Sequence, residues 1–219
     1  AFYSEQIVRL PGSYQVNDRQ RAIAAQTLSR AALGLPQQGF VFCCFNNNYK
    51  ITPEVFSLWM RLLSQLPDSV LWLLADNPGA VANLRHEAAR RGVAPERLVF
   101  AERAPLPEHL ARQRAADLFL DTLPCNAHTT ASDALWAGLP LLTCAGAAFA
   151  GRVAARLLHA VGLPALVTES QAGYEALAIA LAHDPARLKA LRDILQAQLP
   201  TAPLFDTQRF AHGIEAVYT

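Results

Sequence analysis

Short apolar runs alternate along the chain with longer segments in which apolar residues recur at helical spacing. The runs have the length of strands and are apolar on both faces, which is typical of buried parallel strands. They are Phe40–Phe45, Val70–Leu74, Leu98–Phe100, Leu118–Leu120, Pro140–Thr143 and Ala165–Val167. The segments between them predict helices over Pro53–Leu66, Pro78–Arg91, Pro107–Ala116, Thr130–Ala137 and Arg152–Val161, then two or three helices from Ser170 to Val217. This alternation predicts a doubly wound α/β domain.

Local signals mark several helix ends. Thr52, Asn77 and Asp184 each stand immediately before a proline, so each can cap a helix in which the proline takes the first position. Gly92 and Gly162 follow helical patterns and are expected to end them.

The first 35 residues do not follow the alternation. Leu10–Tyr14 contains proline and glycine, and Asp18–Leu33 has the pattern of one helix. We therefore expect residues 1–35 to be a linker and helix that lead in from a preceding lobe. Residues 36–219 are expected to form the α/β domain with its C-terminal helices.

Composition narrows the class of protein. The 219 residues are 52% hydrophobic and 17% charged, which suits one globular core. A net charge of +1 without runs of one sign argues against a nucleic-acid-binding surface. The longest uncharged stretch, Ala134–Gly151, is interrupted by glycines and a proline, which argues against a membrane span. The four cysteines include no CxxC pair and no signal peptide is visible, so we expect reduced thiols and a cytoplasmic protein.

Polar residues gather in four predicted loops, and ligands of doubly wound sheets bind beyond the carboxyl ends of the strands. The loops are Asn46–Ile51, Glu102–His109, Asp121–Thr130 and Ala145–Arg152. The first holds three asparagines and Lys50, which suit a loop that hydrogen-bonds a polar ligand and neutralises an anion. An asparagine turn with a solvated lysine accounts for the same residues equally well on spacing alone.

The third loop leads from a strand into a helix through His128, Thr129 and Thr130. Thr130 and Asp133 have the spacing of a capping box, and the threonine hydroxyls with the free N–H groups of a helix start can bind an anion. A well-capped helix without a ligand is the alternative, although His128 adds a further donor. A thiol nucleophile at Cys125 is weakly supported by the nearby His128, and we favour a structural or ligand-adjacent cysteine.

The second loop runs into a helix on which His109 and Arg112 share a face. Their planar groups can stack on a base or bind its edges, and an ordinary surface helix is the alternative. The signatures GxGxxG and GxxxxGK[ST] are absent, which counts against a dinucleotide or P-loop site. No cluster of carboxylates indicates a required metal.

In this order and spacing, the three motifs resemble the C-terminal lobe of the protein O-GlcNAc transferases. The resemblance is most specific at HTT (128–130) before DALWAGLP (133–140), and it also includes Ile51–Leu74, Leu120–Pro140, Gly151–Ala155 and Pro203–Thr207. It begins near Tyr3–Glu5 and covers nearly the whole chain. It implies a Rossmann-like doubly wound parallel sheet, the C-terminal lobe of a GT-B glycosyltransferase, which binds UDP-N-acetylglucosamine (UDP-GlcNAc) and needs no metal or other cofactor.

Matched residue by residue, the resemblance implies contacts with the diphosphate of UDP-GlcNAc. Lys50 and the run of His128, Thr129 and Thr130 should hold the phosphates, and Lys50 should stabilise the leaving UDP. Asn47 stands where the family has glutamine, so its shorter amide reaches less far toward the phosphate or sugar.

The same matching implies contacts with the nucleoside. The backbone of Ala104 and the side chains of His109 and Arg112 should bind the uracil, and Asp133 should hydrogen-bond the ribose. Leu106 stands where animal members have lysine, which removes one polar contact with the nucleotide.

The implied reaction is the inverting transfer of N-acetylglucosamine to Ser or Thr hydroxyls of acceptor proteins. Family members carry an N-terminal lobe, which supplies the acceptor side and a catalytic histidine, and tetratricopeptide repeats. No repeat of about 34 residues is visible here, so we expect this chain to be incomplete as a catalyst and to work with such a lobe, in the same or in a separate polypeptide. Two rivals fit the same motifs: a GT-B-fold sugar-nucleotide epimerase or transferase with a small-molecule acceptor, and a UDP-sugar-binding module without catalysis.

Overall fold

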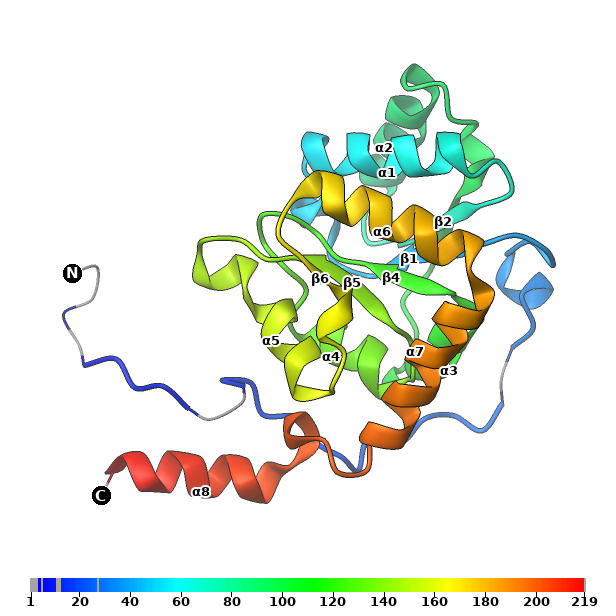
Figure 1. The fold of residues 1–219 in the computed structure, drawn as a ribbon. Coiled ribbons are helices and arrows are strands. Elements are labelled where there is room, and N and C mark those ends of the chain that lie inside the picture. Colours follow the sequence, from blue (N-terminus) through cyan, green and yellow to red (C-terminus); the bar gives the residue numbers. More distant parts are fainter. Residues whose placement is uncertain (1–3, 5, 11–12, 27, 219) are drawn as a thin grey trace.

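The computed structural model describes residues 4, 6–10, 13–26 and 28–218. Within these ranges a six-stranded sheet has the order β3-β2-β1-β4-β5-β6, and every pairing is parallel (Figure 1). The strands are β1 (Val41–Cys44), β2 (Val70–Leu74), β3 (Leu98–Ala101), β4 (Leu118–Leu120), β5 (Leu141–Cys144) and β6 (Val167–Thr168). All six predicted strands are confirmed. The last is shifted by two residues, because Pro164–Leu166 forms a 3-10 turn.

The described residues form eight α-helices. They are α1 (Pro53–Gln65), α2 (Pro78–Arg90), α3 (Leu106–Arg112), α4 (Thr129–Trp136), α5 (Val153–Ala160), α6 (Gln171–His183), α7 (Pro185–Gln198) and α8 (Thr207–Tyr218). Helices α1 to α6 each follow a strand, as the alternation predicts, and α7 and α8 come after α6. The pair α1 and α6 packs on one face of the sheet with α2, whereas α3, α4 and α5 cover the other face (Figure 1). The doubly wound prediction is therefore confirmed. The predicted helix Pro107–Ala116 is shorter, because its last turn is a 3-10 turn at Gln113–Ala115.

Residues buried on both faces of the sheet make the core. Every residue of β1, β2, β4 and β5 is buried, which accounts for strands that are apolar on both faces. Trp59 of α1 and Trp72 of β2 are at most 1% exposed. Burying a large apolar side chain contributes roughly 1.5–3 kcal/mol, so such positions supply much of the stability of the lobe.

Most of the predicted helix ends are confirmed. The side chains of Thr52, Asn77 and Asp184 accept backbone N–H groups of the first turns of α1, α2 and α7. Gly92 and Gly162 follow α2 and α5 with φ angles of 75° and 74°, a left-handed conformation in which a side chain would be strained.

The strand order reverses between β1 and β4, which are neighbours in the sheet although two strands separate them in sequence. Helix α1 leaves β1 toward one face and α4 leaves β4 toward the other (Figure 1). The crevice at such a switch point, beyond the carboxyl ends of the strands, is where doubly wound sheets bind ligands. The first and third polar loops lie at this point.

The predicted helix over Asp18–Leu33 is wrong. The described residues of this range have no regular structure or lie in turns and bends, apart from a 3-10 turn at Ala31–Leu33. The segment is held across the lobe by three hydrogen bonds of 3.0 Å to distant carbonyls. Arg19 donates to a carbonyl in the C-terminal region, Ala24 to one in α3, and Arg30 to one just after α3. An extended chain spans about 3.3 Å per residue against about 1.5 Å in a helix, so these distant contacts prevail over the local pattern.

Two further sequence predictions concern the chain ends and the membrane. Pro11 and Gly12, which interrupt the stretch Leu10–Tyr14, lie outside the described residues. None of the helices in the described part of the chain is long and apolar enough to cross a bilayer. The uncharged stretch Ala134–Gly151 is divided among the end of α4, β5 and a 3-10 turn, as its glycines and proline predict.

Candidate functional site

The loops after β1 and β4 meet at the switch point. The Lys50 ammonium, Nζ, donates to the carbonyl of Asn126 at 2.8 Å, two residues before His128. Lys50 and His128 therefore lie at the same edge of the sheet, which confirms the predicted placement. The contact brings a positive side chain next to the start of α4, the positive end of its helix dipole.

Asn46 joins the two loops from inside the protein. It is 1% exposed, its Nδ2 donates to Thr122 Oγ1 at 2.7 Å, and its Oδ1 accepts from the Thr130 hydroxyl. Asn48 Nδ2 donates to a carbonyl of β2 at 3.3 Å. Two of the three asparagines thus hold the loop, as a structural turn would, whereas the half-buried Asn47 side chain bonds to no described residue.

The first turn of α4 presents open donors. The backbone N–H groups of Thr129, Thr130 and Ala131 donate to no described residue, and Thr129 is exposed. The predicted capping box is not formed: the helix begins at Thr129, the Thr130 hydroxyl reaches across to the β1 loop, and Asp133 pairs with Arg21. The alternative of a well-capped helix is therefore wrong, and the uncapped groups suit an anion.

His128 stands just before α4 and has a partner at each ring nitrogen. Nδ1 lies 2.8 Å from the Tyr14 hydroxyl, and Nε2 lies 3.5 Å from the carbonyl of Ala150. Burial lowers the pKa of His128, and the charge of Lys50 adds to this effect. A neutral ring that accepts at Nδ1 and donates at Nε2 satisfies both contacts.

Asp121 organises the loop between β4 and α4. Its carboxylate is fully buried, and Oδ1 accepts the backbone N–H groups of Thr122 at 2.8 Å and Ala127 at 2.6 Å. Oδ2 accepts the Thr143 hydroxyl at 2.6 Å. Burial raises the pKa of Asp121 to about 7, although these hydrogen bonds and Lys50 oppose the rise. The carboxyl group shapes the loop from below and is not accessible to a ligand.

The loop after β5 closes on the same edge. Asn126 N donates to Ala150 O at 2.9 Å. A side chain at Gly151 would place its Cβ 2.8 Å from Pro124 O, closer than real contacts allow. Glycine at this position lets the two loops pack directly against each other.

His109 and Arg112 form a half-buried pair on Phe45. Arg112 is 8% exposed and donates from Nη1 to Glu102 O at 2.6 Å, and its Nη2 lies 2.7 Å from His109 Nδ1. The guanidinium carbon and the His109 ring centroid each lie 5.1 Å from the Phe45 ring centre. The alternative of an ordinary surface helix is therefore wrong.

The pair leaves His109 as the group that can face a ligand. Burial, aided by the charge of Arg112, lowers the pKa of His109 to about 4, so the ring is neutral at pH 7. Because Nδ1 accepts from Arg112, the proton of the neutral ring sits on Nε2, which has no partner among the described residues. Arg112 bonds to both His109 and Glu102, so it can hold this ring in place.

The loop after β3 adds free backbone groups next to this pair. The N–H and C=O of Ala104 bond to no described residue, and Ala104 is half-buried. Leu106, at the start of α3, is 45% exposed. The loop therefore offers one donor, one acceptor and an apolar side chain.

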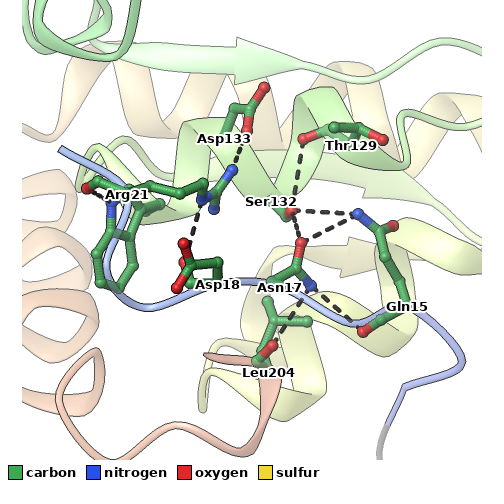
Figure 2. A network of polar contacts seen from close by, with 9 residues as sticks. Gln15, Asn17, Asp18, Arg21, Thr129, Ser132, Asp133 and Leu204 are labelled. Atoms are coloured by element: carbon green, nitrogen blue, oxygen red, sulfur yellow. Dashed lines mark hydrogen bonds and ion pairs between the residues drawn. The ribbon is translucent and has the colours of Figure 1, made fainter. Parts of the chain in front are cut away.

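The segment before β1 reaches α4 through contacts that the sequence did not indicate. Figure 2 shows Gln15 and Asn17 beside Ser132, whose hydroxyl donates to Asn17 Oδ1 at 2.5 Å. The next residue of α4, Asp133, pairs with Arg21. The sequence signal for these residues is weak, because short polar residues in an irregular segment are typical of turns.

The arrangement of potential metal ligands and of the cysteines bears on two further predictions from the sequence. The described residues include no group of three or more His, Cys, Asp or Glu side chains that could hold a metal ion. All four cysteines are free. Cys125 Sγ lies 3.9 Å from Asn126 O, and the described contacts of His128 are with other groups, so no Cys–His dyad is formed.

The doubly wound parallel lobe with polar loops at its switch point has the fold of the C-terminal lobe of a GT-B glycosyltransferase. The chain belongs to glycosyl transferase family 41, which it matches over residues 14–214.

Relatives named for their activity support this assignment. The chain is 40% identical over 222 residues to the probable UDP-N-acetylglucosamine–peptide N-acetylglucosaminyltransferase SEC of Arabidopsis thaliana, covering 99% of this chain and 23% of the plant protein. It is 37% identical over 187 residues to the UDP-N-acetylglucosamine–peptide N-acetylglucosaminyltransferase of Caenorhabditis elegans, covering 85% of this chain and 16% of that protein. A mutant of the Thermobaculum terrenum O-GlcNAc transferase matches 98% of this chain with 40% of its own, at a TM-score of 0.85 and 34% identity. The chain thus spans a quarter or less of these two curated relatives.

Proposed function

We propose that this chain is the UDP-GlcNAc-binding part of an inverting glycosyltransferase that transfers N-acetylglucosamine to Ser and Thr hydroxyls of proteins. The observation that carries the proposal is the meeting of Lys50 with the uncapped start of α4 at the switch point. A lysine and a helix start aimed at one place suit a diphosphate. Family membership and the activities for which the relatives are named support the choice of donor and acceptor.

In this proposal the diphosphate lies against Lys50, the hydroxyl of Thr129 and the first N–H groups of α4. Thr130 contributes its backbone N–H group, with Asn47 and His128 at the margins. Negative charge builds up on UDP as the glycosidic bond breaks, and fixed positive groups stabilise that charge most in the transition state. Lys50 and the helix dipole can perform this role without a metal ion.

The nucleoside extends toward α3. The free N–H and C=O of Ala104 and the Nε2–H of His109 offer the donors and acceptor that a uracil edge requires. Arg112 acts through His109, whose ring it orients. Asp133, one turn after Thr129 on α4, accepts a hydrogen bond from the ribose.

The rest of the enzyme supplies the acceptor side. We propose that residues 1–35 connect to a preceding lobe that carries the catalytic base, accompanied by a tetratricopeptide region, and that the protein works in the cytoplasm. The short share of each curated relative that this chain covers supports such a lobe.

Titration calorimetry on the 219-residue chain tests the donor site. We expect UDP to bind more tightly than UMP, which lacks one phosphate, and more tightly than ADP, which carries another base. Equal affinities for all three nucleotides, or no binding to a folded chain, would contradict the proposed site.

The two rivals differ in products. With the preceding lobe restored, labelled UDP-GlcNAc should mark an acceptor protein. Free or epimerised sugar without protein labelling would favour a small-molecule enzyme, and UDP binding without turnover would favour a binding module.

A further inference from the structure

Arg21 places its guanidinium against Asp133, the residue proposed to bind the ribose. The two side chains form an ion pair between Arg21 Nη1 and Asp133 Oδ1, and they are 13% and 9% exposed. Asp133 Oδ2 accepts no hydrogen bond from the described residues, and Figure 2 shows it pointing away from Arg21. The pair thus uses one carboxylate oxygen and leaves the other for a ligand.

Arg21 is held by contacts that do not involve Asp133. Its Nε donates to Asp18 O at 3.2 Å, and its own carbonyl accepts from Trp136 Nε1 at 3.0 Å. The guanidinium carbon lies 5.8 Å from the Trp136 ring and 5.9 Å from the Phe205 ring. Arg21 therefore has one defined position before any ligand arrives, which lowers the ordering cost of binding.

The charge of Arg21 also affects the acceptor strength of Asp133. Burial raises the pKa of Asp133, and the charge and hydrogen bond of Arg21 oppose that rise. An ionised carboxylate accepts a hydroxyl hydrogen bond more strongly than a neutral carboxyl does. Removing Arg21 would weaken the acceptor even if Asp133 stayed in place.

We propose that Arg21 is a positioning residue of the nucleoside subsite, which holds Asp133 Oδ1 so that Oδ2 is presented to a ribose hydroxyl. The inference rests on the proposed function and extends it to a residue of the segment before the lobe. A merely structural alternative is that the ion pair only fastens that segment to α4. The two alternatives differ in whether the loss of Arg21 reduces the contribution of a ribose hydroxyl to UDP affinity.

The test compares the affinities of UDP, 2′-deoxy-UDP and 3′-deoxy-UDP for the 219-residue chain by calorimetry. For the unmodified chain, a nucleotide that lacks the ribose hydroxyl bonded to Asp133 should bind about tenfold or more weakly than UDP, since hydrogen bonds to charged groups are strong. We call the ratio of the UDP affinity to the deoxy-UDP affinity the deoxy penalty. Arg21→Met keeps the apolar stem over Trp136 but loses the donors, so in this variant the deoxy penalty should fall toward onefold. Asp133→Asn should show a similar loss of discrimination.

Arg19→Met is the matched control. Arg19 fastens the same segment through Phe205 O at 3.0 Å and Asp206, and its side chain forms no hydrogen bond or ion pair with the described residues of α4. If the segment merely needs fastening, Arg19→Met and Arg21→Met should weaken UDP and deoxy-UDP equally. Arg21→Lys restores the charge and should recover part of the deoxy penalty, and it serves as the test if Arg21→Met does not fold.

The outcomes separate this inference from the proposed function. Failure of the unmodified chain to bind UDP contradicts the proposed function and the inference with it. Binding with a deoxy penalty that disappears in Asp133→Asn but persists in both Arg21 variants overturns the inference alone. Loss of the penalty in Arg21→Met and Asp133→Asn, with the penalty intact in Arg19→Met, supports it.

Discussion

At the scale of single residues, Lys50 and Lys189 are the same side chain in different surroundings. Lys50 reaches the loop before α4, whereas Lys189 is 75% exposed on α7 and pairs with Asp193. We expect Lys50→Ala to weaken UDP binding about 10- to 150-fold, because hydrogen bonds to charged groups contribute roughly 1.5–3 kcal/mol. Calorimetry on the chain measures this change, and Lys189→Ala is the control that should bind UDP normally.

Turnover adds a second readout for Lys50. If its contact strengthens as charge builds up on the leaving UDP, the complete enzyme should lose more rate than affinity. Unchanged affinity together with unchanged turnover would exclude Lys50 from the donor site.

Arg112 illustrates how burial changes the role of a residue. Its spacing with His109 predicted two side chains that face a base, and the structure brings them together on Phe45. The guanidinium bonds to Glu102 O and to the His109 ring, so we expect it to act on a ligand through His109.

At the scale of elements, the loop between β4 and α4 depends on Asp121. Burial raises the pKa of this carboxyl group from 3.8 to about 7. Between these pH values the folded chain keeps a proton that the unfolded chain has released, so the contribution of Asp121 to stability is full at low pH and is lost as pH rises through this window. From about pH 5 to pH 7.5, wild type should lose roughly 2 kcal/mol relative to Asp121→Asn, which cannot ionise.

Urea denaturation of both proteins at the two pH values measures this difference. Asp193→Asn, at a 63% exposed side chain on α7, is the control, and its difference from wild type should stay constant. A constant difference for Asp121→Asn as well would show that the buried carboxyl group does not titrate in this window.

The start of α4 also depends on contacts with other parts of the protein. The spacing of Thr130 and Asp133 predicted a capping box, but both side chains bond to other parts of the protein. The helix keeps its first N–H groups free because its potential caps are used elsewhere, and the same groups then become available to an anion.

At the scale of the whole molecule, the residues that we propose to bind the donor all lie on this one lobe. In a GT-B enzyme the acceptor is held by the other lobe. We therefore expect the 219-residue chain to bind UDP but not to transfer sugar, because positioning of the reactants supplies roughly 7–11 kcal/mol of barrier lowering in well-oriented reactions.

An assay with labelled UDP-GlcNAc and a protein acceptor, with and without the preceding lobe as a separate polypeptide, tests this expectation. Transfer should depend on the added lobe. Robust transfer by the chain alone would mean that the catalytic groups lie within residues assigned here to other roles.

The alternation of apolar runs and helical segments was sufficient to predict the sheet and its switch-point loops. Burial on both faces leaves a clear mark on a strand, as in Val70–Leu74, whose predicted and observed limits coincide. Caps such as Thr52 are equally local, since donor and acceptor stand three residues apart. The placement of Lys50 and of the start of α4 at one edge could be predicted for a similar reason, because both follow strands whose carboxyl ends meet at that edge.

Partners distant in the sequence were decided by the tertiary structure alone. Asn46 meets Thr122 across 76 positions, and Arg21 meets Asp133 across 112. Such pairs have no periodicity, and they form only after the sheet has brought separate loops to one edge. The same long-range contacts keep the described residues of Asp18–Leu33 out of their local helical pattern, because each bond to a distant part of the lobe requires a reach that a helix does not have.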